Sequence, residues 1–125
     1  MPEKPKVLPP TLREKKRYLA YQVISPKDIP LTDLYNAIWF SILNLLGEAG
    51  AAKANIWLGK DMWNDQKKIG IIKCSHVEVE NVRAALTLIN RIGDIPVIIH
   101  VLGISGTIRG ARRKFFGEVL LSSFG

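Results

Sequence analysis

The sequence predicts an α+β domain built around one four-stranded antiparallel sheet. Four short runs are rich in β-forming residues and bounded by proline, glycine or asparagine, whereas two longer runs have the apolar spacing of helices. These runs alternate as strand, helix, strand, strand, helix, strand, and a further helical run follows. With 125 residues, of which 47% are hydrophobic, the chain can bury one core without disulfides or a metal.

The expected elements follow one another with short connections. The strands are expected at residues 17–25, 53–60, 67–75 and 95–104. The helices are expected at residues 32–47, 77–91 and about 107–122, where Thr32 and Thr107 are good N-caps and Gly47 and Gly93 are stop signals. This βαββαβ order predicts a ferredoxin-like, or RRM-like, sandwich with a C-terminal helix added.

The first 16 residues differ from the rest of the chain. They contain four prolines and several basic side chains, so we expect a basic, proline-rich arm at residues 1–16 and one domain at residues 17–125. The start lacks the long apolar run of a secretion signal, and no apolar run is long enough to span a bilayer. We therefore expect a cytoplasmic protein with no membrane partner.

The net charge of +7 is concentrated at the two ends of the sequence. Residues 1–17 carry six basic and two acidic side chains, residues 106–121 carry four and one, and residues 18–105 carry eight of each. A neutral body with two basic ends indicates a polyanionic partner such as RNA more strongly than a generally basic surface would. The alternative is that the charge serves solubility or thermal stability.

Candidate catalytic and metal-binding groups are scarce. His76 and His100 are isolated, and the spacing of His100 along its strand favours a core or interface histidine. Cys74 lies in an expected strand and is interpreted as a small apolar filler. Asp61 and Asp65 flank a turn, which explains them without a metal. We expect no catalytic residue and no metal or cofactor site in this chain.

The C-terminal helix carries the candidate RNA contacts. At about 100° per residue, Ile108, Ala111, Phe115 and Val119 form an apolar stripe that would dock on the open face of the sheet. Basic side chains occur on this helix and, as a second set, at the end of the arm. Arginine suits phosphate because its planar guanidinium can donate two parallel hydrogen bonds. The predicted RNA-binding residues are Arg109, Arg112, Arg113, Lys114, Lys15, Lys16 and Arg17.

Stacking of bases on the sheet, as in an RRM, is not expected. The third strand has isoleucine where the RRM has aromatic residues, and Tyr18 and Tyr21 fall on opposite faces of the first strand.

The first helix predicts a protein-binding surface. It is apolar over most of its circumference, so a second apolar stripe remains after one face has packed on the sheet. A partner protein, neighbouring loops or the third helix could cover this stripe. The predicted partner-facing residues are Tyr35, Trp39, Leu43, Leu46, Ala85 and Leu88.

Two segments resemble a known family. Residues 105–113 (SGTIRGARR), which follow a hydrophobic strand, and residues 8–18 (LPPTLREKKRY) resemble the archaeal form of the archaeal and eukaryotic ribonuclease P protein component 2 family. The resemblance implies a subunit of an RNA-based endonuclease that removes the 5′ leader from precursor tRNA. It implies that the RNA with its Mg²⁺ performs the hydrolysis and that this chain supports the RNA and meets precursor tRNA only indirectly.

The resemblance also implies partners. They are ribonuclease P RNA and ribonuclease P protein component 3, with a homodimer of this chain within a heterotetramer left open. Two other functions remain as alternatives on the residues alone. One is a ferredoxin-like regulatory domain that binds a small molecule at the turn of residues 103–107, and the other is a phosphohydrolase of the acylphosphatase type.

Overall fold

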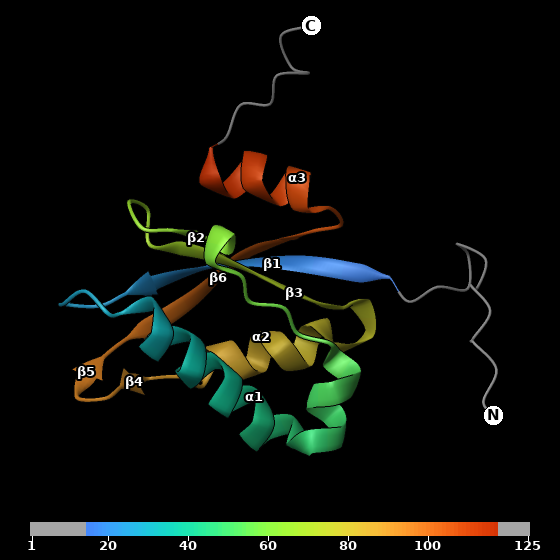
Figure 1. Ribbon diagram of the computed structural model, residues 1–125, viewed down its shortest axis with the longest axis horizontal. Helices are drawn as coiled ribbons and strands as arrows, with labels where there is room; N and C mark the ends of the chain where they lie inside the picture. The colour runs from blue at the N-terminus through green and yellow to red at the C-terminus, as the bar shows by residue number, and fades with distance from the viewer. Residues whose placement is uncertain (1–14, 118–125) are drawn as a thin grey trace, which may run out of the picture.

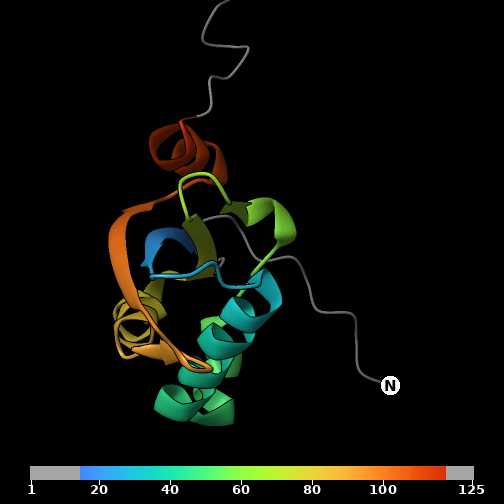
Figure 2. The same cartoon turned by 90° about the vertical axis from the view of Figure 1, so that its left-hand side faces the viewer.

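The computed structural model, which describes residues 15–117, has three layers (Figures 1 and 2). The middle layer is a four-stranded antiparallel sheet. Its strands, in spatial order, are β2 (Trp63–Asn64), β3 (Ile69–Ser75), β1 (Lys16–Ile24) and β6 (Ile98–Ser105). The helices α1 (Leu31–Ala54) and α2 (Val79–Thr87) cover one face, and α3 (Ile108–Ala111), continued by the π-helical turn η3 (Arg112–Phe116), covers part of the other.

Shorter elements connect these layers. They are the 3-10 turns η1 (Lys60–Met62) and η2 (His76–Glu78), and a small hairpin of β4 (Arg91–Ile92) and β5 (Ile95–Pro96). The two central strands of the sheet, β1 and β3, pair from Lys16 opposite Ser75 to Gln22 opposite Ile69. Strand β6 runs along the other side of β1. This arrangement confirms the predicted ferredoxin-like fold with an added C-terminal helix.

The larger core lies between the sheet and the helices α1 and α2. Side chains of β1 and β3 alternate between the two faces of the sheet, so every second residue of each strand enters this core. Its fully buried members include Leu19, Tyr21, Leu34, Ile38, Ile42, Ile72, Val82 and Leu86.

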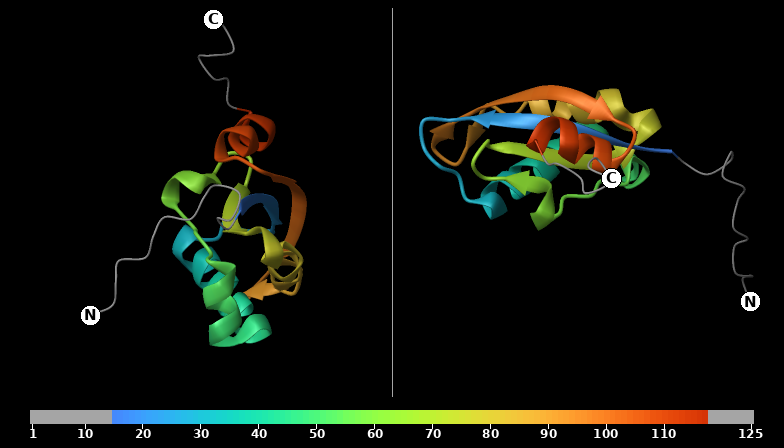
Figure 3. Two further views of the ribbon diagram at one scale, coloured as in Figure 1. Left: turned by 90° about the vertical axis from the view of Figure 1, so that its right-hand side faces the viewer. Right: turned by 90° about the horizontal axis from the view of Figure 1, so that it is seen from above.

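A smaller core lies on the opposite face, beneath α3. It contains Ala20, Met62, Ile69, Ile71, Ala111 and Phe116. The adjacent residues Ile71 and Ile72 are both fully buried, although they belong to different cores. The right panel of Figure 3 shows α3 lying over the strands on this face of the sheet.

The second predicted strand, residues 53–60, is wrong. The backbone of Gly47 is not helical (φ 73°, ψ 175°), yet helical structure resumes beyond it and ends at Ala54. Ala51 and Ala54 are buried against the larger core, and this burial favours a second helical segment over an early stop. The edge strand β2 is consequently displaced to Trp63–Asn64.

Three other boundaries also differ from expectation. The second helix ends at Thr87, before the hairpin β4–β5, in which Gly93 adopts a φ of 60°. Residues 95–104 divide between this hairpin and β6 because the chain turns back at Val97, whose N–H donates to the carbonyl of Asn90. The C-terminal helical segment ends at Phe116 because Gly117 is left-handed (φ 73°). The predicted residues 118–122 of that helix, and residues 1–14 of the arm, lie outside the described residues.

Candidate nucleic-acid interface

A side-chain cap starts α3 and explains the spacing of serine, threonine and glycine before the basic residues. Thr107 has an extended backbone, and its Oγ1 accepts a hydrogen bond from the N–H of Gly110 at 3.0 Å. The Ser105 hydroxyl donates to the Thr107 carbonyl at 2.9 Å. A Cβ at position 110 would lie 2.9 Å from both Ser105 Oγ and Thr107 Oγ1, so the cap requires glycine there.

The apolar side of α3 fixes the helix on the sheet. Ala111 is fully buried, and Phe116 is nearly so. A Cβ at Gly103 of β6 would lie 2.7 Å from Cζ of Phe115, which means that this ring rests directly on the strand backbone. The predicted docking of Ile108, Ala111 and Phe115 is confirmed, since all three belong to the smaller core or pack against it.

The four basic residues of this helix have different surroundings. Arg109 and Arg113 are exposed and lie about one turn apart. Arg112 is half-buried: its Nη1 donates to the Asp61 carbonyl at 2.7 Å, and its guanidinium lies 5.4 Å from the centre of the Phe116 ring. Arg112 therefore ties the helix to η1. Lys114 is exposed, with its ammonium 5.4 Å from the centre of the Phe115 ring.

The basic start of β1 lies beside the start of α3. Tyr18 of β1 pairs with Ser105, the residue at which β6 ends and the cap of α3 begins. Lys15 is exposed, and its carbonyl accepts the backbone N–H of His76 at 2.9 Å. Lys16 and Arg17 are half-buried, and Arg17 Nη1 donates to the Lys16 carbonyl at 2.8 Å. Strand pairing thus brings the two basic segments of the sequence to the same end of the molecule (Figure 1).

Sequence reasoning missed two residues of this region. Lys73 is opposite Tyr18 on β3, and Trp57 forms an isolated bridge with Lys73 on the outer side of that strand. The side chain of Trp57 is 57% exposed. The face of Lys73 could have been read from the alternation of β3, but the place of Trp57 could not, because the edge strand was predicted in the wrong segment.

The predicted partner-facing residues of α1 are mostly covered by this chain itself. Tyr35, Leu43 and Leu46 are half-buried against the larger core. The hydroxyl of Tyr35 donates to the Gly59 carbonyl at 2.6 Å, so the segment after α1 packs over this stripe. Trp39 is the more accessible member of the stripe and remains 42% exposed.

The two predicted residues of α2 have opposite placements. Ala85 is fully buried where α1 meets α2, and its carbonyl accepts the Ser41 hydroxyl at 2.7 Å. Its inclusion in a partner surface is therefore wrong. Leu88 is 62% exposed beyond the end of α2.

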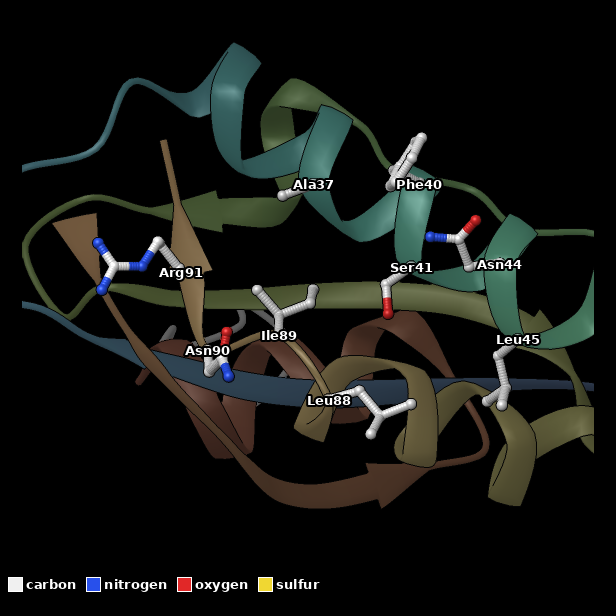
Figure 4. Close-up of a pocket in the computed structure, with 9 residues that line it drawn as sticks. All are labelled: Ala37, Phe40, Ser41, Asn44, Leu45, Leu88, Ile89, Asn90 and Arg91. Atoms are coloured by element: carbon white, nitrogen blue, oxygen red, sulfur yellow. The ribbon is translucent and has the colours of Figure 1, made fainter. Parts of the chain in front are cut away.

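A groove between α1 and the end of α2 reveals apolar residues that the sequence reasoning missed. Figure 4 shows Phe40 and Leu45 on α1 and Leu88 on the other side of the groove, whose volume is about 380 Å³. Phe40 is 66% exposed and Leu45 is 43% exposed. Phe40, Asn44 and Leu45 form no apolar stripe on α1 by themselves. The groove could not be predicted from that helix alone, because residues at the end of α2 and in the loop after it complete it.

The isolated titratable groups show no catalytic arrangement in the described part of the chain. His100 is exposed on β6, so it is not a core histidine, and the other expectation, an interface histidine, stays a prediction. Burial raises the pKa of the Cys74 thiol from its ordinary 9.0 to about 11, with a smaller contribution from the charge of Glu78. Cys74 is therefore a neutral thiol at physiological pH and a weak nucleophile.

Residues 15–117 contain neither a cluster of metal ligands nor a membrane-spanning helix. There, His, Cys, Asp and Glu side chains form no group of three that could hold a metal ion. Within the same residues no helix is both long and apolar enough to cross a membrane.

Comparisons with known proteins agree with this fold and motif. The family model of the Rpp14/Pop5 family matches residues 17–116. The chain is 46% identical to ribonuclease P protein component 2 of Pyrococcus furiosus over 118 residues, which are 94% of this chain and 97% of the relative. It is 42% identical to the protein of the same name from Thermococcus kodakarensis, with the same coverage.

A solved structure is also similar at the level of the fold. A chain in the cryo-electron microscopy structure of yeast ribonuclease MRP superposes with a TM-score of 0.57 at 10% sequence identity, covering 90% of this chain and 93% of that one. The match over residues 17–116 and the 46% identity to a relative covered almost in full lead to one conclusion: the chain belongs to the Rpp14/Pop5 family, in the group of ribonuclease P protein component 2.

Proposed function

We propose that this chain is a non-catalytic, RNA-binding protein subunit of ribonuclease P. In this role it supports the RNA that cleaves the 5′ leader from precursor tRNA, as the names of its relatives suggest. The observation that carries the proposal is the meeting of two basic segments, from opposite ends of the chain, at one end of the molecule, where β1 begins beside the start of α3.

The basic groups of this side suit a phosphate backbone. Arg109 and Arg113 project from a helix that is already held in place by its packing and its cap. Binding therefore costs little additional backbone entropy. Each guanidinium presents a planar fork of donors that matches a phosphate group. Lys15 adds a further exposed charge at the neighbouring end of β1.

The test removes charge without touching the fold. Arg109→Ala with Arg113→Ala should weaken binding to ribonuclease P RNA and lower the slope of log affinity against log salt by about 0.7 to 0.9 for each phosphate that the variant no longer neutralises. Cleavage of precursor tRNA by the reconstituted enzyme should fall in parallel. Arg112 is left in place because its bond to the Asp61 carbonyl also holds α3.

A matched control removes the same charge elsewhere. Lys27→Ala with Lys53→Ala affects two exposed residues in the loop before α1 and in the last turn of α1. This variant should keep the salt slope of the native chain. Equal loss of affinity in both variants would mean that net charge alone, and not the α3 side, governs RNA binding.

The RNA supplies the metal-dependent chemistry in this proposal. Mg²⁺ belongs to the RNA of the holoenzyme, and precursor tRNA meets this chain indirectly. Purified chain without the RNA should leave precursor tRNA intact at any Mg²⁺ concentration. The alternative of a small-molecule regulatory domain is not favoured, because the turn at residues 103–107 is filled by the Ser105–Thr107 hydrogen bonds and by the contact of Phe115 with Gly103.

The helix layer is the proposed surface for ribonuclease P protein component 3. Phe40, Leu45 and Leu88 expose apolar area around one groove, and Trp39 lies on a neighbouring side of α1. Phe40→Asp should abolish co-elution with component 3 while leaving RNA binding unchanged. Ile24→Asp, which places the same charge on an exposed isoleucine at the end of β1, is the control and should still co-elute.

The proposed assembly contains two copies of this chain and two of component 3, and its place is the cytoplasm. Light scattering of the co-purified proteins should give the mass of a heterotetramer. A mass of one copy of each protein would reject the homodimer within that assembly.

A further inference from the structure

A row of side chains crosses the sheet on the α3 side, next to the start of that helix. Trp57 pairs with Lys73, Lys73 pairs with Tyr18, and Tyr18 pairs with Ser105. Directly paired residues of antiparallel strands project from the same face. Tyr18 packs against the smaller core, so the whole row lies on the face that carries α3. Two aromatic side chains thus flank a lysine.

The backbone holds Trp57 in place although no regular strand contains it. Its N–H donates to the Lys73 carbonyl at 2.9 Å, and the Lys73 N–H donates back to the Trp57 carbonyl at 3.1 Å. The neighbouring Ile56 and Leu58 pack against the larger core on the opposite face. Trp57 is therefore fixed from both sides by its own segment, while its ring remains 57% exposed.

The indole ring is also located by a glycine. A Cβ at Gly59 would lie 3.1 Å from Nε1 of Trp57 and 2.7 Å from the Asp61 carboxylate, so the edge of the ring lies over bare backbone. A large aromatic ring that lies against backbone and is left half-open to solvent has fewer rotamers to lose on binding. Such a surface stacks a planar ligand at a low entropic cost.

The charges around this row suit a nucleic acid. Lys73 lies between the two rings. Lys16, two residues before Tyr18 in β1, projects from the same face. Arg112 lies close by, since it is bonded to the carbonyl of Asp61, two residues beyond Gly59. The Asp61 carboxylate lies near Gly59, at the edge of the Trp57 ring, so like charge disfavours a phosphate at that edge and leaves Lys73 as its place.

We propose that Trp57 stacks an unpaired base of a bound RNA, with Lys73 on the adjoining phosphate and Tyr18 beside the next nucleotide. Adjacent strands are about 4.8 Å apart, so the two aromatic residues are separated by about 10 Å with the lysine between them. This spacing fits neighbouring nucleotides that are splayed rather than paired. The inference rests on the proposed function, namely that the chain binds RNA, and it assigns the single-stranded part of that RNA to this row.

The test removes the exposed ring of Trp57 and keeps the fold. In the full chain, Trp57→Ala should lower affinity for ribonuclease P RNA and for a short single-stranded oligoadenylate by roughly five- to a hundred-fold, the range measured for removal of one base–aromatic stack. Trp57→Phe, which retains an aromatic face, should keep most of the affinity. Trp39→Ala removes the other well-exposed tryptophan, on α1, and should leave the affinity for both RNAs unchanged, whatever it does to the contact with component 3.

Fluorescence provides a second readout that a purely structural role would not change. Oligoadenylate should quench the tryptophan emission of the native chain and of Trp39→Phe, and this quenching should disappear in Trp57→Phe. A duplex of the same length should quench much less, because its bases are already stacked on each other. Lys73→Met should weaken binding and reduce its salt dependence while leaving the quenching at saturation intact.

The outcomes separate this inference from the proposed function. If the native chain binds ribonuclease P RNA and loses affinity on removal of Arg109 and Arg113, whereas Trp57→Ala binds as the native chain does, the stacking site is refuted and the function stands. If the native chain binds no RNA, both fall. If Trp57→Ala keeps RNA affinity but no longer co-elutes with component 3, the row is a protein contact and the inference is overturned.

Discussion

The two faces of the sheet are built with different balances of core and surface. The face under α1 and α2 buries the larger core, and its helices expose apolar residues such as Phe40 and Leu88. The face under α3 buries a small core, and its surface carries Arg109, Arg113 and Lys114. Most of the buried apolar side chains therefore lie on one side of the sheet, and these exposed basic side chains lie on the other.

This difference has a consequence for how each face tolerates change. The larger core is shared by the helices α1 and α2 and by the strands β1, β3, β4 and β6, so its loss unfolds the chain. The smaller core holds one short helix whose last turn ends at Phe116, so its loss can release that helix while the sheet stays folded. The proposed role of this helix in RNA binding can therefore be measured separately from the stability of the chain.

Adjacent isoleucines on β3 give the strongest test of this comparison. Ile71 and Ile72 are both fully buried, one under α3 and the other under α1 and α2. We expect Ile72→Ala to cost about 4 kcal/mol and Ile71→Ala about 2 kcal/mol, because the smaller core can relax by a shift of α3. Urea unfolding followed by circular dichroism measures both. Equal losses would show that α3 is as rigidly packed as the helix layer.

Truncation of the ring at the end of α3 should separate stability from RNA binding. Phe116 is nearly buried, and Arg112 lies over its ring. Phe116→Ala should reduce the free energy of unfolding by only about 1 to 2 kcal/mol, since the helix can leave the sheet locally, yet it should strongly weaken binding to ribonuclease P RNA. Hydrogen exchange should increase in residues 108–116 alone. Increased exchange throughout β1 and β3 would contradict the separate release of this helix.

A smaller change at the start of the same helix tests its cap. Gly110→Ala places a Cβ 2.9 Å from the Ser105 and Thr107 side-chain oxygens. The loss should be about 1 kcal/mol or more, because the hydrogen bond from Gly110 N–H to Thr107 is strained or broken. Thr107→Ala removes that bond without the clash and is the matched comparison. A gain in stability for Gly110→Ala, as in an ordinary helix, would reject the role of the cap.

The side of the sheet that was predicted well is the one with strong local signals. The Thr107 cap, the apolar spacing of Ile108 and Ala111, and the placement of the arginines beside that stripe could all be derived from sequence positions that are close together. Strand pairing then brought the basic start of β1 to the same end, which the sequence could not reveal, because only the register of Tyr18 with Ser105 determines it.

The helix side was predicted less well because its surface is formed by segments that lie far apart in the sequence. Gly47 signals a helix end, yet burial of Ala51 and Ala54 continues the helical structure beyond it. The segment that follows then covers the stripe of Tyr35 and displaces the edge strand. For the same reason Trp57 emerges on the α3 side, where no pattern within its own segment placed it.

The hydrogen bond of Tyr35 joins the two sides, and its titration gives the smallest expected effect. The Tyr35 hydroxyl on α1 donates to the carbonyl of Gly59, the residue on which the Trp57 ring lies. Burial first, and the charge of Asp61 second, raise the pKa of Tyr35 from 10.0 to about 12. A pKa raised by folding means that the contribution to stability is fully present below the unfolded value and is lost as the pH rises through the folded one.

Stability should therefore decline above about pH 9 to 10, where the unfolded chain begins to lose protons that the folded chain retains. Cys74, with its pKa raised from 9.0 to about 11, contributes in the same direction. Tyr35→Phe should be less stable than the native chain at neutral pH and should lose less stability between neutral and alkaline pH. Its Trp57 emission should also shift, since the segment under the ring is no longer held by α1. An unchanged alkaline loss would mean that this hydroxyl titrates alike in the folded and unfolded chain, and that the link between the two sides lies elsewhere.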